Sequence, residues 1–182
     1  MREMTNEERA KLYPVILSEY NPAWPQWYAE EKERLVQHIG VENIVRVTHI
    51  GSTAVPGLMA KPTIDILLEI TNYVDVTTMI DSLPNDEYIC LRKQTIPSSD
   101  LVLFLKGYTE TGFAEKVYHI HVRYPDDWDE VRFRDYLIAH PEAAKAYAAL
   151  KRQLKEQFEF DRDGYTNAKG KFIKMVGESN LY

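Results

Sequence analysis

The chain has 182 residues, 45% of them hydrophobic and 12% aromatic, which suffices to bury the core of a single domain, expected over residues 1–182. Its net charge of −6 argues against an extended nucleic-acid surface, because such a surface neutralises many phosphates with Lys and Arg. The single cysteine excludes a disulfide framework, and the lack of a signal-peptide core or of a run of roughly 18 apolar residues leads us to expect a cytoplasmic protein without membrane contact.

The first expected elements are a strand over residues 13–20 and a helix that ends near Ile39. Asn21 and Pro22 are typical of a helix N-cap and first turn. The apolar residues of this helix fall at helical spacing on one face, and we expect Glu31 to lie away from that face.

Two strands follow, over residues 44–50 and 64–70. The first is rich in β-branched residues, and the second is apolar apart from Asp65 and Glu69, as expected of strands with a buried face. A short helix is then expected over residues 73–83.

The rest of the chain is expected to form strands and then helices, which predicts an α+β fold with a mixed β-sheet flanked by helices and a helical C-terminal part. Strand composition covers residues 88–92, 101–106 and 116–123, residues 107–112 are typical of a hairpin connection, and helical patterns cover residues 128–140, 141–158 and 165–177.

Candidate ligand-binding residues concentrate at the end of the 44–50 strand. Gly51, Ser52 and Thr53 form a turn whose backbone N–H groups and hydroxyls can bind an anion. Asp65 on the following strand can hold a divalent cation, Mg²⁺ or Mn²⁺, against that anion. The anion-binding turn and the neighbouring acid together suggest a site for a metal and a nucleotide, with Asp65 as its catalytic and metal-binding residue.

Asp65 requires compensation, because an unpaired carboxylate in an apolar strand costs several kcal/mol to bury. A divalent cation is one compensating group. The alternatives are Lys61, Arg46 or a set of backbone donors.

Two histidines are separated by one residue on an expected strand, so that both project from the same face. His119 and His121 can ligate a metal or bind phosphate, or they can lie at a sheet edge and bond to nearby carboxylates. The closely spaced ligand motifs usual for zinc are absent.

Lys169 follows Tyr165 by four residues on one helical face, where its ammonium group can meet a triphosphate. The alternative is an ordinary solvated basic face near a helix C-terminus. No P-loop, GxGxxG or GxSxG motif occurs, so Ser52 is not expected to be a nucleophile.

The chain resembles the GrpB family, and the resemblance extends over nearly its whole length. It is carried by His49-Ile50-Gly51-Ser52-Thr53-Ala54-Val55-Pro56-Gly57-Leu58, Ala60-Lys61-Pro62, Ile64-Asp65-Ile66, His119-Ile120-His121-Val122, Phe133-Arg134-Asp135-Tyr136-Leu137 with His140-Pro141, and Ala168-Lys169. This resemblance implies a place in the nucleotidyltransferase superfamily, whose fold is a mixed sheet flanked by helices. In some relatives a similar domain is fused to dephospho-CoA kinase, which hints at nucleotide or coenzyme metabolism.

The resemblance also implies roles for particular residues. Gly51 and Ser52 would contact nucleotide phosphates, and Asp65 would be the first of two metal-binding acids. The second acid would fall at Leu67, which cannot coordinate a metal. Glu69 lies roughly 13 Å from Asp65 along the strand and is a poor substitute.

The leading hypothesis is a nucleotidyltransferase-like protein that binds a nucleoside triphosphate, or another phosphate-bearing small molecule, with magnesium or manganese. One alternative is a non-catalytic nucleotide-binding or regulatory domain that lacks the second acid, as the leucine at position 67 suggests. A further alternative is a hydrolase in which Asp65 and the two histidines surround a transition metal.

Overall fold

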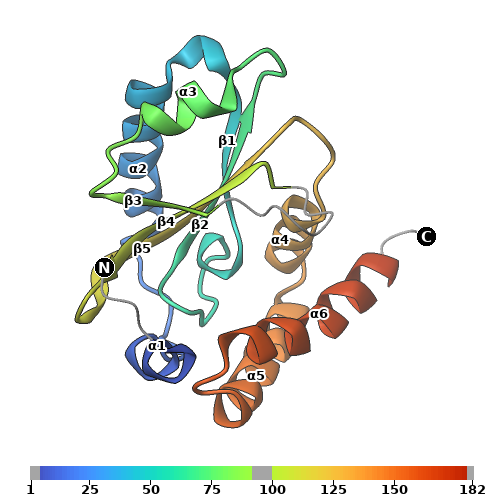
Figure 1. Cartoon of the computed structure of the whole chain (residues 1–182). Helices are drawn as coiled ribbons and strands as arrows, with labels where there is room; N and C mark the ends of the chain where they lie inside the picture. Colours follow the sequence, from blue (N-terminus) through green and yellow to red (C-terminus); the bar gives the residue numbers. More distant parts are fainter. Residues whose placement is uncertain (1–4, 92–99, 180–182) are drawn as a thin grey trace.

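A mixed β-sheet is the centre of the molecule. The computed structural model describes residues 5–91 and 100–179 (Figure 1). Within these ranges five strands form one sheet of order β1-β2-β5-β4-β3, in which β2 and β5 are parallel and the other neighbouring pairs are antiparallel. The strands are β1 (Ile44–Ile50), β2 (Ile64–Ile70), β3 (Tyr88–Leu91), β4 (Val102–Thr109) and β5 (Gly112–Arg123).

Helices lie on both sides of this sheet. Figure 1 shows α2 and α3 on one side and the three C-terminal helices on the other, which confirms the expected α+β class and its helical C-terminal part. No helix in the described part of the chain is both long and apolar enough to cross a bilayer. The helices are α1 (Asn6–Leu12), α2 (Trp24–Ile39), α3 (Val76–Asp81), α4 (Asp129–Ala139), α5 (Pro141–Gln157) and α6 (Arg162–Ser179).

The main core lies between the sheet and α2. Alternate residues of a strand point to opposite faces, so the even-numbered apolar residues of β2 pack against Trp24 and Leu35 of α2, both fully buried. Each such side chain contributes about 1.5–3 kcal/mol of hydrophobic free energy. The odd-numbered residues Asp65, Leu67 and Glu69 therefore point to the opposite face, toward the C-terminal helices.

The expected strand over residues 13–20 is wrong. This segment forms only an isolated bridge between Ser18 and Ala60, and the Val15 amide donates to the Glu159 carbonyl at 2.7 Å. Because its hydrogen bonds go to two different parts of the chain, the segment is an extended connection and adds no strand to the sheet.

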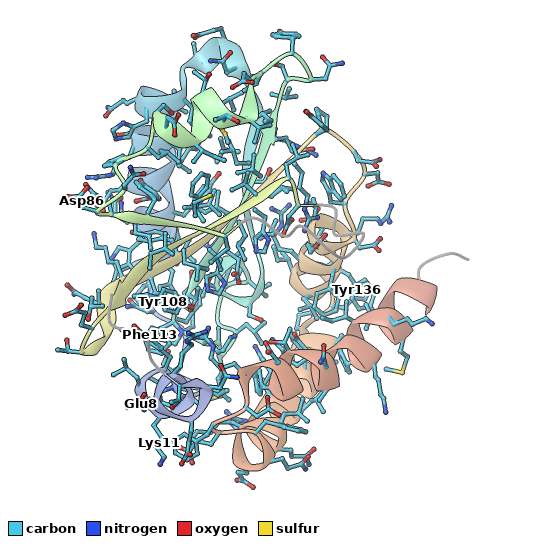
Figure 2. All side chains as sticks on the ribbon, in the orientation of Figure 1. Glu8, Lys11, Asp86, Tyr108, Phe113 and Tyr136 are labelled. Carbon is cyan, nitrogen blue, oxygen red and sulfur yellow. The ribbon has the colours of Figure 1, made fainter. Side chains whose placement is uncertain are left out.

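The first helix was not expected, although the sequence contains its signal. Thr5 and Glu8 form a capping box that starts α1, with each side chain accepting from the other's backbone amide. The residue after this helix, Tyr13, packs on Tyr108 and Phe113 of the β4–β5 hairpin, which are labelled in Figure 2. Helix α1 is thereby held beside the sheet.

Several boundaries differ from the expected ones. Helix α2 begins two residues after Pro22, and α3 begins at Val76 because the Asp75 side chain caps it by accepting from the Thr78 amide at 2.7 Å. Gly107 lies inside β4 at an irregularity of the ladder, so the hairpin turn is shorter than expected. Arg92, expected as the end of a strand, lies outside the described residues.

Glu31 is buried, which corrects the expectation that it lies away from the apolar face of its helix. Its carboxylate accepts hydrogen bonds from the Tyr88 hydroxyl at 2.5 Å and from the Lys106 ammonium group at 2.9 Å. The buried face of α2 is therefore wider than its apolar residues indicate. It includes the charged Glu31, whose carboxylate finds hydrogen-bond partners on β3 and β4.

Candidate functional site

The turn after β1 requires glycine at its first position. Gly51 has a φ of +73° and a ψ of −175°, and a Cβ at this position would lie 2.5 Å from Oδ2 of Asp65. Ser52 begins a short 3-10 turn directly after it. The backbone of this turn thus passes close to the carboxylate of β2.

Thr53 stabilises the turn from inside. It is buried, its hydroxyl donates to the Thr63 carbonyl at 3.2 Å, and the same oxygen lies 2.9 Å from Nε2 of His49. Burial lowers the pKa of His49 to about 4, with the nearby charges of Asp65 and Arg134 acting in opposite directions, so this imidazole is neutral. Thr53 was expected to bind ligand, but its hydroxyl is used within the protein.

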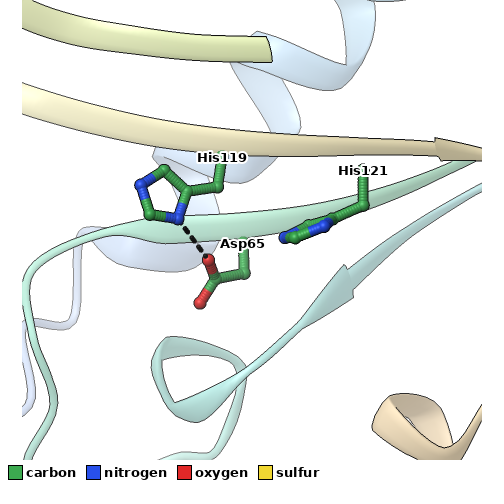
Figure 3. A group of neighbouring side chains, drawn as sticks. All are labelled: Asp65, His119 and His121. Atoms are coloured by element: carbon green, nitrogen blue, oxygen red, sulfur yellow. Dashed lines mark ion pairs between the residues drawn. The ribbon is translucent and has the colours of Figure 1, made fainter. Parts of the chain in front are cut away.

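Parallel pairing of β2 with β5 brings the expected metal and histidine residues together. In the register of the two strands Asp65 lies beside His119, and Figure 3 shows both side chains and His121 directed into the same space. Asp65 Oδ1 is 3.2 Å from Nδ1 of His119. One ligand atom from each of the three residues lies within 4.8 Å of the others.

Asp65 is an anion in this environment. Burial opposes its ionisation, but the hydrogen bond from His119 and the positive charge of the two histidines and Lys61 lower its pKa to about 2. Burial lowers the pKa of His119, and the neighbouring Asp65 carboxylate partly offsets that effect. The sequence left a divalent cation, Lys61, Arg46 and a set of backbone donors open as compensating groups. In the structure, His119 forms the direct contact with the carboxylate.

Three lysines converge from other elements. Lys151 of α5 donates to Ser52 Oγ at 3.2 Å, and the ammonium groups of Lys61 and Lys169 lie 5.6 and 4.6 Å from the centre of the Tyr165 ring. Burial, followed by mutual repulsion among these cations, lowers the pKa of Lys61 and of Lys151 to about 7. Such repulsion is relieved when an anion binds among them.

These groups share one cavity of about 830 Å³, a volume usual for small-molecule sites. It lies between the sheet and the C-terminal helices. The structure therefore brings together all the residues expected from the sequence to bind ligand or metal, namely Gly51, Ser52, Thr53, Lys61, Asp65, His119, His121 and Lys169.

Several cations of this cavity were missed in the sequence, among them Lys151 and Arg162. Lys151 is 1% exposed, and its signal was its place four residues after Tyr147, on the buried face of α5 that also includes Leu154. Arg162 also lines the cavity and donates to the Tyr108 hydroxyl at 2.9 Å. Nothing in the sequence around Arg162 distinguishes it from a surface arginine.

No second acid of β2 lies beside Asp65. Leu67 is fully buried. Glu69 is also buried, and its carboxylate pairs with Arg46 and accepts from the Trp128 indole N–H at 3.1 Å. Glu69 therefore belongs to a separate group of contacts at the other end of the strand.

Comparison with known proteins decides the family. A family model described as GrpB protein matches residues 14–179. The chain belongs to the GrpB family. A solved structure of GrpB from Enterococcus faecalis has the same fold, with a TM-score of 0.77 and 31% identity over 90% of this chain and 96% of that one. The resemblance expected from the motifs is confirmed.

Other relatives are longer than this GrpB chain. It is 34% identical over 174 residues to the UPF0157 protein YqkA of Bacillus subtilis, covering 92% of this chain and 48% of YqkA, about half the length of that relative. It is also 27% identical over 177 residues to a protein named dephospho-CoA kinase from Mycolicibacterium paratuberculosis, covering 86% of this chain and 43% of that protein.

Proposed function

We propose that this GrpB protein binds a nucleoside triphosphate or a related phosphate ligand together with a divalent metal ion, and that it transfers a nucleotidyl group. The observation that carries the proposal is a single cavity in which the anionic Asp65 and the Ser52 turn face three lysines, one of which, Lys151, is fully buried. The similarity to a protein named dephospho-CoA kinase is consistent with a nucleotide-related ligand.

The residues of the cavity have distinct roles in this proposal. The hydroxyl of Ser52 and the backbone of its turn bind phosphate oxygens, and Lys61, Lys151 and Lys169 neutralise the charge of the phosphates. Asp65 would hold the metal ion, which would supply further charge neutralisation for the phosphates. Positioning and electrostatic stabilisation are what such a transfer reaction requires from the protein.

A second candidate is a non-catalytic nucleotide-binding or regulatory domain. Leu67 at the position of the second acid favours it, and Glu69 is already paired with Arg46. The two candidates share the same cavity and differ in turnover. Only the enzyme releases pyrophosphate or labels an acceptor.

Thermal unfolding with a panel of nucleotides, with and without Mg²⁺, Mn²⁺ or Co²⁺, tests the shared part of both candidates. A ligand at about 100 times its dissociation constant adds roughly 2.7 kcal/mol, or about 5–10 °C for a chain of this size. We expect this shift to depend on metal, to disappear in Asp65→Asn and Ser52→Ala, and to persist in Asp86→Asn, whose exposed side chain does not line the cavity.

The absence of a shift with every nucleotide and metal contradicts the proposal. A metal-dependent shift followed by pyrophosphate release supports the transferase. The same shift with neither pyrophosphate release nor acceptor labelling supports the binding domain.

A further inference from the structure

The possible ligand atoms of Asp65, His119 and His121 do not match magnesium, the metal expected from the sequence. Mg²⁺ prefers six oxygen ligands, whereas this group offers one carboxylate and two imidazoles. Imidazole nitrogen is a preferred ligand of zinc and of other first-row transition metals. Two histidines and one carboxylate form a set that such metals bind while one or more coordination positions stay open.

The ring of His121 is held from outside the site. Its Nδ1 lies 2.9 Å from Oδ2 of Asp100, and that carboxylate also accepts from Nε of Arg123. A ring whose Nδ1–H donates to a carboxylate presents the lone pair of Nε2 on its other side. A carboxylate behind a histidine is the usual support of a metal-binding imidazole.

His119 has an equivalent support from a different residue. Its Nε2 lies 2.7 Å from the hydroxyl of Tyr108, and that hydroxyl accepts from Arg162 at 2.9 Å. Its Nδ1 is thereby directed toward Asp65, at 3.2 Å from Oδ1. Each histidine therefore has one nitrogen bonded to a supporting group and the other nitrogen available to the site.

Strand register explains how the site compensates for the missing second acid. In the parallel β2–β5 pair, Asp65 lies beside His119 and Leu67 lies beside His121. The position where the second acid was expected thus carries leucine, and the neighbouring strand supplies an imidazole next to it. The side chains of His119 and His121 are 18% and 21% exposed, so both are accessible from the cavity.

We infer that Asp65, His119 and His121 form a three-ligand site for a first-row transition-metal ion of the class of Zn²⁺, Fe²⁺ and Co²⁺, in preference to Mg²⁺. Asp100 and Tyr108 are the positioning residues of this site. The inference adds the class of metal to the proposed function. It rests on that function only where a phosphate ligand is concerned, and metal binding itself is independent of it. A fourth coordination position facing the cavity is left for a water or a phosphate oxygen.

The test uses the metal alone, so failure of nucleotide binding does not decide it. Full-length protein without a histidine tag is treated with chelator and titrated with Co²⁺, with visible absorption and calorimetry as readouts. We expect a visible absorption spectrum typical of Co²⁺ with nitrogen ligands. Zn²⁺ should displace the bound Co²⁺, and a large excess of Mg²⁺ should not. A Co²⁺ affinity no higher than that for Mg²⁺ overturns the inference.

Variants separate this site from adventitious histidine binding. His121→Ala is expected to weaken Co²⁺ binding by more than about 100-fold, and Asp100→Asn and Tyr108→Phe by about 10- to 100-fold each. His38→Ala, on the exposed face of α2, serves as the matched control and is expected to change nothing. Thermal unfolding in chelator checks that each variant folds. Unchanged affinity in folded His121→Ala overturns the inference.

Discussion

Lys151 of α5 donates a hydrogen bond to Ser52 Oγ at 3.2 Å and joins the C-terminal helices to the turn after β1. The same ammonium group donates to the Met59 carbonyl. Lys151 is only 1% exposed. Neither of these partners is a carboxylate, and a buried cation without a counter-charge is costly. A phosphate bound at Ser52 would supply that counter-charge. Ligand binding would thereby offset the energetic cost of burying Lys151.

Replacement of Lys151 by methionine separates these two effects. Methionine fills much of the volume of the lysine stem and removes the buried charge, so we expect the melting temperature to stay within a few degrees. Affinity for inorganic tripolyphosphate should fall by about 10- to 100-fold, the range for a lost hydrogen bond to a charged group. Calorimetry and thermal unfolding measure the two quantities.

The matched control is Lys145→Met on the same helix, where the side chain is 74% exposed. It is expected to leave both affinity and melting temperature unchanged. Equal loss of affinity in the two variants would show that the effect comes from the overall charge of the protein and not from the cavity.

The lowered pKa values of the lysines predict how anion binding depends on pH. With a pKa of about 7, the protonated fraction of Lys61 and of Lys151 falls from about 0.9 at pH 6 to about 0.1 at pH 8. Affinity for sulfate, which stays dianionic over this range, should therefore decrease by about tenfold or more. Calorimetry at several pH values measures the decrease, and a pH-independent affinity in the wild-type protein contradicts it.

The same pKa values set the sign of a stability effect. In the folded state the two lysines release their protons near pH 7, whereas in the unfolded state they keep them until about pH 10.5. The unfolded state thus binds more protons between these limits, so these groups make the free energy of unfolding rise with pH there. Urea unfolding at pH 7 and pH 9 is expected to show a weaker rise in Lys151→Met.

Local signals were enough to predict most of the fold. Helical spacing and the Asn21-Pro22 start indicated α2, and apolar composition or helical patterns indicated β2 and the C-terminal helices. The prediction of a strand over residues 13–20 was wrong, because strand-like composition does not specify which strand the segment pairs with. The burial of Glu31 depends on Tyr88 and Lys106, which are distant in sequence, and no local pattern contains that information.

The candidate site was predicted less completely. Asp65 and the Gly51 turn were visible as a motif, but the pairing of Asp65 with His119 results from the β2–β5 register. Parallel pairing across a long connection is not specified by spacing. Lys151 lies four residues after Tyr147 on the buried face of α5, but only the packing of that helix distinguishes it from the other lysines of this charged segment.

Glu69 and Asp65 are expected to differ in how their neutral substitution affects metal binding. Glu69 is buried and accepts from Arg46 and Trp128, so Glu69→Gln should lower the free energy of unfolding by about 1–3 kcal/mol and leave Co²⁺ affinity unchanged. Asp65→Asn should abolish tight Co²⁺ binding and also lower the free energy of unfolding, because the folded protein holds the pKa of this carboxyl at about 2. Urea unfolding and metal titration give both quantities, and loss of metal binding in Glu69→Gln would place that carboxylate in the metal site.

Two glycines provide a test of the close approach between the turn and Asp65. Gly51 and Gly57 have nearly equal φ values of +73° and +74°, but a Cβ on Gly51 would lie 2.5 Å from Asp65 Oδ2, whereas one on Gly57 would meet no atom within 4 Å. Alanine at either position strains the backbone by about 1–3 kcal/mol. Only Gly51→Ala also displaces the carboxylate, so it alone should weaken Co²⁺ and tripolyphosphate binding, and it should lower the free energy of unfolding further than Gly57→Ala. Equal binding by the two variants would mean that the turn adapts without moving Asp65.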